Sequence, residues 1–353
     1  MEEVRFLKEL VAIPSPSGQE ERVGRFLVEE MAERGFKAHL DDVGNAIGIA
    51  GDPDAARTIV LLGHMDTVPG DVPMRVENHS QFYGRGSVDA KGPLATFVMA
   101  TTRVVPKLRD TRIIVIGAVE EERNGRGARH LAETMDAPDF AIIGEPSDWE
   151  GVTLGYKGRL CLHYRHEQPG SHSAGDVVGP AEKAVTFWNS LMDYADIRNH
   201  GEFGRFNTFD PALRDFRTFS DGLNDGVEMR ITMRLPPDFE PEVLKQRMRA
   251  WGNGAELEYS ALDMPYKGDK NTPLVRALLK GIRAEGGRPR FKLKTGTSDM
   301  NTVGPVWDCP IVAYGPGDSS LDHTPYEHVD LHEYKRAIRI LSHALEILGT
   351  DPR

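Results

Sequence analysis

Cysteine is scarce in this sequence. Its 353 residues include only two cysteines, Cys161 and Cys309, which are far apart and lie in apolar runs. A secreted domain held together by disulfide bonds needs a denser set of cysteines, so a disulfide framework is excluded. We interpret both residues as buried, reduced thiols, which are typical of a cytoplasmic protein.

The sequence also lacks an apolar stretch of about 20 residues, the length that a membrane-spanning helix needs. The first ten residues, MEEVRFLKEL, are amphipathic and acidic. They have neither the basic start nor the apolar centre of a secretory signal peptide. We therefore expect a cytoplasmic protein without a membrane partner.

An excess of positive charge is absent as well. The 43 Lys and Arg residues are outnumbered by 54 Asp and Glu residues, and the formal net charge at pH 7 is -11. Nucleic acids and anionic lipid surfaces are polyanions, so this charge disfavours both as partners. We expect no nucleic acid to bind.

A dinucleotide-binding glycine motif is missing too. No third glycine follows Gly84-Arg85-Gly86 at the required spacing, and Asp89-Ala90-Lys91 is unlike a phosphate-binding loop. A dinucleotide-dependent oxidoreductase is therefore disfavoured, and a titration with a dinucleotide cofactor would test this alternative directly.

The first 150 residues alternate between helical and strand patterns. Ser17-Gly18-Gln19-Glu20 has the form of a capping box, and apolar residues then recur at helical spacing. Short apolar runs at 58–62, 112–119 and 140–143 predict buried strands, and a helix is expected to begin near Pro93. This alternation predicts an α/β fold with a mixed, largely parallel sheet between helices.

The pattern changes over residues 155–264. Alternating apolar residues at 160–164 and 227–235 predict strands, and a helix is expected over 180–191. We interpret 155–264 as an inserted α+β domain.

The buried-strand pattern returns after the insertion, with an apolar run at 310–314 and a closing helix at 331–348. We therefore predict one catalytic domain made of residues 1–154 and 265–353. The chain has enough residues for two domains of ordinary size.

Polar residues follow the predicted strands at the point where each strand ends. In open α/β sheets, this edge is where ligands bind. Four separate strand ends carrying histidine or carboxylate side chains are unlike a chance scatter of solvated loops. The residues are His64, Asp66, Glu120, Glu121, Glu145 and His323.

Imidazoles and carboxylates without nearby thiolates suit zinc or another divalent metal in a hydrolytic site. Asp66 can bond the second imidazole nitrogen of His64 and so determine its tautomer. Adjacent residues at a strand end point to opposite sides, so one of Glu120 and Glu121 can bind metal while the other faces a water molecule. Glu122 is interpreted as a solvated loop charge.

Five segments resemble, in the same order, the dinuclear zinc peptidase and deacylase family. This family includes acetylornithine deacetylase, succinyl-diaminopimelate desuccinylase and glutamate carboxypeptidases, and it cleaves linear amides. Each segment is only modestly specific, but together they span nearly the whole chain. They are Gly63 to Pro69, Gly84 to Gly92, Glu120-Glu121, Gly144 to Ser147 and His323 to Glu327.

The resemblance implies two divalent metal ions per subunit, Zn²⁺ or Co²⁺. Asp89 would bridge the two ions. His64 and Glu145 would complete one metal site, and Glu121 and His323 would complete the other.

The resemblance also implies catalytic roles. Asp66 would orient His64, and Glu120 would be the general base. Val119 departs from the family, in which many members have Asp before the paired glutamates. The departure affects the expected hydrogen bonding at this point and leaves the ligand set intact.

Within the family, three segments most closely resemble the hydrolases that release lysine from an amino-group carrier protein in amino-acid biosynthesis. The implied substrate is an acidic carrier protein charged with lysine, or with ornithine as in arginine biosynthesis. The segments are Gly117 to Glu122, Gly296 to Asn301 and Tyr314 to Pro325.

In the family the inserted domain is a lid and a dimer interface, so a homodimer is expected. His172, in Gly170-Ser171-His172, resembles a lid histidine that stabilises the oxyanion from the partner subunit, and Arg234 resembles a carboxylate-binding arginine. Gly296 and Thr297 are expected to border the substrate pocket.

Basic lid residues could dock an acidic carrier, although a scatter of solvated side chains explains them as well. They are Lys157, Arg159, Arg198, Arg205, Arg214 and Arg217.

Two further alternatives stay open. The first is a small-molecule deacylase such as acetylornithine deacetylase or succinyl-diaminopimelate desuccinylase. The second is a metal-bound scaffold without activity, which loss of Glu120 or of a ligand would favour, but all these residues are present.

Overall fold

The structure is a computed structural model that describes residues 2–172 and 174–350, and the chain forms two compact units. Unit 1 takes its residues from Met1–Gly155, Gly268–Leu293 and Ser298–Arg353. Unit 2 consists of Tyr156–Lys267 and Lys294–Thr297. Apart from the short second segment, unit 2 spans nearly the same residues as the predicted insertion.

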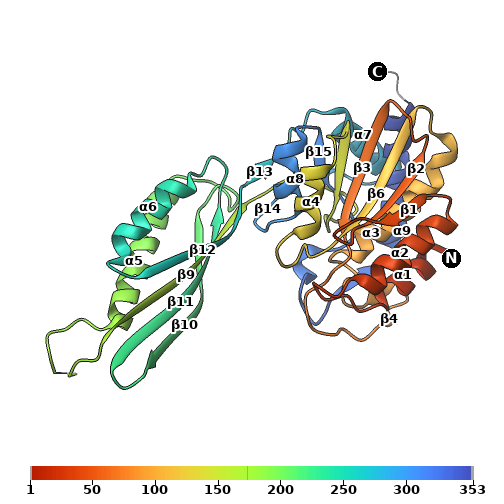
Figure 1. Ribbon diagram of the computed structural model, residues 1–353. Helices are drawn as coiled ribbons and strands as arrows, with labels where there is room; N and C mark the ends of the chain where they lie inside the picture. The colour runs from red at the N-terminus through yellow and green to blue at the C-terminus, as the bar shows by residue number, and fades with distance from the viewer. Residues whose placement is uncertain (1, 173, 351–353) are drawn as a thin grey trace. The chain divides into compact units, whose positions relative to one another are not determined.

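Unit 1 contains a large mixed sheet (Figure 1). Its strands are β1 (Lys37–Leu40), β2 (Ala46–Gly51), β3 (Arg57–His64), β6 (Thr111–Ala118), β7 (Phe140–Gly144), β8 (Gly151–Tyr156), β14 (Arg290–Lys294) and β15 (Ile311–Ala313). They run in the order β1-β2-β6-β3-β7-β15-β8, and β14 also pairs with β8. Strand β3 lies parallel to β6 and to β7, and β15 lies parallel to β7, whereas β1 and β2 are antiparallel to their neighbours. The predicted α/β class is confirmed.

Helices cover both faces of this sheet. Ile59 and Leu61 of β3 belong to the main core, while the intervening Val60 and Leu62 are also buried, on the opposite face. The helices of unit 1 are α1 (Glu2–Val11), α2 (Glu21–Glu33), α3 (Lys91–Val104), α4 (Arg126–Thr134), α7 (Pro273–Ala284), α8 (Asp299–Trp307) and α9 (Leu331–Thr350), with short 3-10 helices η1 (Val105–Lys107) and η2 (Ser319–Leu321). Helix α9 packs on α3 and α7, and α4 packs on α8.

A small antiparallel sheet completes unit 1. It has the order β16-β5-β4, formed by β16 (His328–Asp330), β5 (Gln81–Tyr83) and β4 (Arg75–Glu77). This sheet pairs β5, which precedes the predicted ligand Asp89, with β16, which follows the predicted ligand His323.

Unit 2 is a four-stranded antiparallel sheet with two helices (Figure 1). The strand order is β10-β11-β9-β12. The elements are β9 (Gly158–Pro169), α5 (Pro180–Asn199), β10 (Asp210–Ser220), β11 (Asn224–Leu235), α6 (Pro241–Gly252) and β12 (Glu256–Asp263), followed by the two-residue strand β13 (Tyr266–Lys267). Its core has alternate residues of β9 and β11, such as Leu160, Leu162, Val227 and Met229, together with apolar residues of the helices. This alternation is the pattern that predicted the strands.

The predicted capping box at Ser17 is wrong. Helix α2 begins at Glu21, and Glu20, at its N-cap, makes no side-chain capping bond. The Glu20 carboxylate instead accepts hydrogen bonds from the backbone N–H groups of Gly18 and Glu120. The Ser17 hydroxyl donates to Asp66, so tertiary contacts have replaced the local cap.

In the described part of the chain, no helix combines the length and apolar character that crossing a bilayer requires.

A buried lysine stabilises unit 2. The side chain of Lys157 is fully buried, and its ammonium donates to the carbonyl oxygens of Arg205 and Thr208 and to Asp210 Oδ2, the last at 2.6 Å. These bonds join the start of β9 to the loop before β10. Lys157 is therefore not available as the surface docking residue that the sequence analysis considered.

We predict that Lys157→Met lowers the free energy of unfolding by about 1–3 kcal/mol, because the carboxylate and carbonyls around the ammonium lose their donor. Urea denaturation followed by circular dichroism measures the change. The control is Arg217→Met, which removes an exposed ion pair with Asp215 in the same unit and should change stability little. Equal midpoints for both variants would contradict a structural role for Lys157.

Candidate metal centre

The candidate site lies at the carboxyl ends of the parallel strands of unit 1. His64 is the last residue of β3, and β6 and β7 end beside it, with Gly63 in register with Gly117 and with Gly144. Glu120, Glu121 and Glu122 follow β6, and Glu145 follows β7. The register of the sheet thus brings three separate chain segments to one edge, as the sequence predicted.

Asp89 lies between the two histidines that were expected to bind metal. Its Oδ1 is 3.2 Å from His64 Nε2, and its Oδ2 is 2.9 Å from His323 Nε2. Burial opposes ionisation of Asp89, but hydrogen bonds with His323 and His64 hold the pKa of its carboxyl well below the usual range. One carboxylate with an oxygen toward each imidazole is the arrangement that bridging two ions requires.

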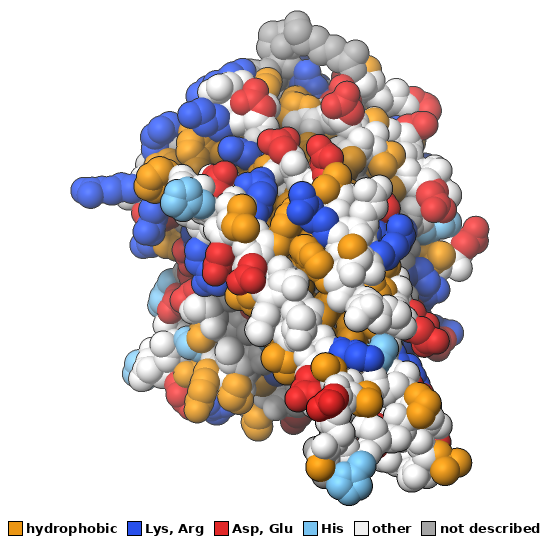
Figure 2. Space-filling model, turned by 90° about the vertical axis from the view of Figure 1, so that its left-hand side faces the viewer, with side chains coloured by type: hydrophobic (Ala, Val, Ile, Leu, Met, Phe, Trp, Pro, Cys, Tyr) orange, Lys and Arg blue, Asp and Glu red, His pale blue; other side chains and the backbone are white. Residues whose placement is uncertain are grey.

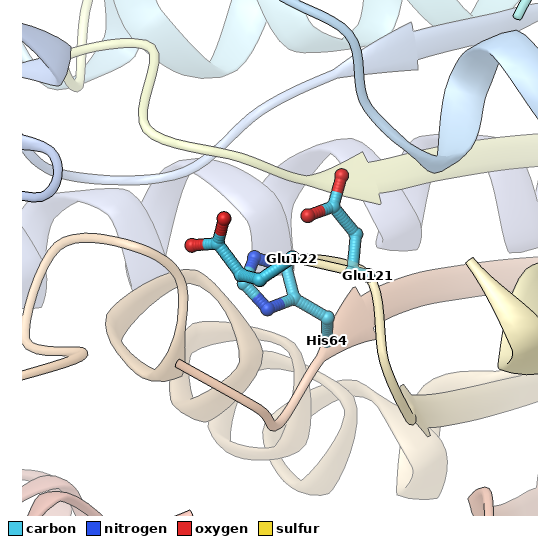
Figure 3. Close-up of side chains that lie close together, drawn as sticks. All are labelled: His64, Glu121 and Glu122. Atoms are coloured by element: carbon cyan, nitrogen blue, oxygen red, sulfur yellow. The ribbon is translucent and has the colours of Figure 1, made fainter. Parts of the chain in front are cut away.

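Glu122 completes this cluster. Its Oε1 is 2.8 Å from His323 Nε2, and its side chain is only 9% exposed. In the described chain, two groups of three residues have possible ligand atoms that, within each group, all lie within 4.8 Å of one another. His64, Glu121 and Glu122 form one group, and Asp89, Glu122 and His323 form the other. Figure 3 shows the imidazole of His64 beside the carboxylates of Glu121 and Glu122. The interpretation of Glu122 as a solvated loop charge is therefore wrong.

These residues fit divalent metal ions. Burial together with the charge of Asp89 raises the pKa of Glu122, and hydrogen bonds to Asp89 and Glu122 raise the pKa of His323 to about 10. Both shifts arise in part from the negative charge of neighbouring carboxylates, which a divalent cation would offset. Imidazole nitrogen and carboxylate oxygen atoms at this spacing form a donor set that zinc accepts.

Asp66 organises the site from behind. Its carboxylate is fully buried, and Oδ1 lies 3.3 Å from His64 Nδ1. The backbone N–H groups of Glu121 and Glu122 donate to Oδ1 and Oδ2, each at 3.1 Å, and the Ser17 hydroxyl donates to Oδ2 at 2.6 Å. One carboxylate thus holds the imidazole of β3 and the turn after β6. This geometry fits the predicted orienting role of Asp66 and extends it.

The carboxylate of Glu120 has a basic partner, Arg126. Strand β6 ends at Ala118, and Glu120 adopts a left-handed backbone conformation with φ 57°, so the expected strand-end alternation does not apply. Its Oε1 accepts a hydrogen bond from Arg126 Nε at 2.8 Å. In the described residues, Glu120 is in neither group of close ligand atoms. This geometry differs from the one that the prediction of Glu120 as base assumed.

Glu121 lies among other acids. Burial and the charges of Glu145 and Asp299 raise the pKa of its carboxyl well above the usual range, while His64 acts in the opposite direction. Glu145 is itself buried and, in the described chain, belongs to neither close group of ligand atoms. Asp299, at the start of α8, was not singled out from the sequence, because no strand was predicted in the segment before it.

The remaining predicted residues lie in unit 2. His172 is exposed in the turn between β9 and α5, and its Nδ1 accepts a hydrogen bond from the backbone of Ala174. Arg234 Nη1 lies 3.4 Å from the Thr297 hydroxyl, and burial, together with the charge of Arg159, lowers the pKa of the guanidinium. A side chain at Gly296 would meet open space within unit 2.

The predicted basic docking residues are largely paired with acids. Arg159 binds Asp263, Arg217 binds Asp215, and Arg198 lies 3.5 Å from Glu202. Figure 2 likewise shows basic and acidic side chains interspersed on the face that it draws. These ion pairs favour the alternative interpretation, in which these three arginines belong to a mixed, solvated surface.

We predict that Asp66→Asn weakens Zn²⁺ binding by roughly 10- to 100-fold, the usual effect of losing a partner that orients ligands. The amide offers one acceptor oxygen where the carboxylate uses two, so at least one backbone N–H loses its partner. Competition with a chromophoric chelator measures the affinity. Ser17→Ala, which removes only the hydroxyl donor, should have a smaller effect, and unchanged affinity in Asp66→Asn would contradict the organising role.

The chain is similar to several known proteins. The family model described as Peptidase family M20/M25/M40 matches residues 60–347. A LysW-lysine hydrolase from Deinococcus radiodurans is 44% identical over 348 residues, covering 96% of this chain and 95% of the relative.

Two solved structures share the fold. An M20 family metallo-carboxypeptidase from Sulfolobus solfataricus has a TM-score of 0.81 at 19% identity, and 99% of each chain is covered. A dinuclear metal-binding M20 peptidase from Bacillus subtilis has a TM-score of 0.75 at 13% identity, covering 99% of this chain and 98% of that one. The chain belongs to peptidase family M20/M25/M40.

Proposed function

We propose that this protein hydrolyses the amide bond through which lysine, or ornithine, is held by an amino-group carrier protein. One observation carries the proposal: the chain is 44% identical, over nearly its full length, to a relative named LysW-lysine hydrolase. The close cluster of imidazole and carboxylate groups supports it, because amide hydrolysis at neutral pH needs an activated water molecule. A cytoplasmic location remains part of the proposal.

The proposed cofactor is a pair of divalent ions, Zn²⁺ or Co²⁺. Asp89 would bridge them, since its two oxygens face His64 and His323. Glu122 and His323 would hold one ion, which their 2.8 Å approach supports. His64 and Glu145 would hold the other. This assignment replaces Glu121 of the predicted ligand set with Glu122.

We assign the general base to Glu121 rather than to Glu120. Glu121 lies in the close group with His64, while the carboxylate of Glu120 is bound to Arg126. When bound, paired metal ions lower the pKa of a water molecule and polarise the carbonyl group of the substrate. A Glu121 carboxylate oxygen would accept the proton of that water and then deliver it to the departing amine nitrogen.

Unit 2 would supply substrate contacts and a dimer interface. Arg234 is a candidate for binding the carboxylate of the amino acid. In the described chain its guanidinium has no carboxylate within ion-pair distance and lies near the Thr297 hydroxyl. Gly296 would leave room beside it. His172 would reach the active site of the partner subunit in a homodimer, which its exposed position allows.

Three single substitutions separate the roles of the consecutive glutamates. Glu122→Gln should lower the bound metal, because it removes a ligand. Glu121→Gln should keep the metal and reduce turnover by about 10²-fold or more, since a positioned base contributes that much. Glu120→Gln should keep the metal and most of the turnover. Metal analysis with an activity assay checks all three, and loss of turnover in Glu120→Gln alone would restore the role predicted from the sequence.

We expect kcat/KM to be higher for a lysine-charged or ornithine-charged carrier than for acetylornithine or succinyl-diaminopimelate. A deacylase acting on small molecules is the second candidate, because the same cluster would serve it. An assay of the four substrates under identical conditions, with and without a chelator, decides between them. Preference for acetylornithine, or activity that survives complete metal removal, would contradict the proposal.

A further inference from the structure

We propose that Glu327 is a positioning residue that holds the backbone of the bridging carboxylate Asp89, and that Arg85 holds Glu327 in turn. The inference rests on the metal site proposed above. Both residues lie in segments that the sequence analysis singled out, Gly84 to Gly92 and His323 to Glu327, yet neither received a role there.

The carboxylate of Glu327 is fully buried and is directed at the backbone of Val88 and Asp89. Its Oε1 accepts hydrogen bonds from the backbone N–H groups of Val88, at 3.0 Å, and of Asp89, at 3.1 Å. Two donors on one oxygen restrict the peptide planes that immediately precede the Asp89 side chain. The direction in which Asp89 presents its oxygens to His64 and His323 therefore depends on Glu327.

Arg85 holds the other oxygen of this carboxylate. Its Nη1 lies 2.6 Å from Glu327 Oε2, and its Nε donates to the carbonyl of Gly70 at 3.0 Å. The guanidinium is thus bound at both ends, and its side chain is only 14% exposed. Arg85 orients Glu327, and in the described chain its side chain makes no hydrogen bond to a proposed ligand.

The backbone joins the same two segments. Gly84 N–H donates to the carbonyl of Glu327 at 3.3 Å. Strand β5 pairs with β16, where Tyr83 lies opposite His328, and the centroids of their stacked rings are 4.6 Å apart. His323 lies four residues before Glu327. Glu327 therefore links the segment that carries His323 to the segment that carries Asp89, and these two ligands would share one ion.

Two matched double variants isolate the bonds to the backbone. Arg85→Met combined with Glu327→Gln keeps an amide oxygen that can accept from Val88 and Asp89, and Arg85→Met combined with Glu327→Ala does not. Both lack the ion pair. We expect the alanine variant to bind Co²⁺ roughly 10- to 100-fold more weakly than the glutamine variant, the usual effect of losing a group that orients a ligand. We also expect its Co²⁺ absorption spectrum to change.

Affinity is measured by chelator competition, and thermal unfolding of the metal-free proteins shows whether both variants fold. Arg34→Met with Glu30→Ala is the matched control, since this pair is also largely buried in unit 1 and is remote in sequence from every proposed ligand. Equal Co²⁺ affinity and spectra for the two Glu327 variants would overturn the inference, as would an equal loss in the control. Absence of Co²⁺ binding by the unaltered protein would instead refute the proposed metal site itself.

Discussion

The site depends on the contacts that the carboxylate of Asp66 makes. This carboxylate receives the backbone N–H groups of Glu121 and Glu122 and lies beside the imidazole of His64, all without exposure to solvent. A buried carboxylate is costly unless its oxygens are bonded, and here strand ends from two different segments supply the partners. The same bonds that stabilise Asp66 therefore set the positions of the groups proposed to bind metal and move protons.

The parallel sheet makes this contact possible. Because β3 is in register with β6 and with β7, the three strands end at the same level of the sheet. The side chains that follow them can therefore meet. The third part of the cluster, Asp89 and His323, comes from outside these strands and relies on the small sheet of β5 and β16 and on Glu327. The site thus combines a rigid strand edge with two segments held by side-chain bonds.

Periodicity predicted the fold well, because buried strands such as β3 are continuous apolar runs and the strands of unit 2 alternate. The ligand candidates at strand ends were found for the same reason. The separate roles of Glu120, Glu121 and Glu122 were not predicted, because three identical residues in a row offer no pattern that distinguishes them. Their directions are decided by the left-handed conformation of Glu120 and by its bond to Arg126, neither of which propensity or spacing encodes. Ser17 bonds to Asp66 instead of capping α2 because a distant partner won over a local one.

We propose that Asp89 would bridge two ions, with Glu122 rather than Glu120 or Glu121 beside His323. Anomalous diffraction at the zinc absorption edge, from crystals grown with Zn²⁺, tests it most directly. We expect two peaks, one on either side of the Asp89 carboxylate, with one bonded to Glu122 and His323 and the other to His64 and Glu145. A single peak, or a peak bonded to the carboxylate of Glu120 or of Glu121, would contradict it.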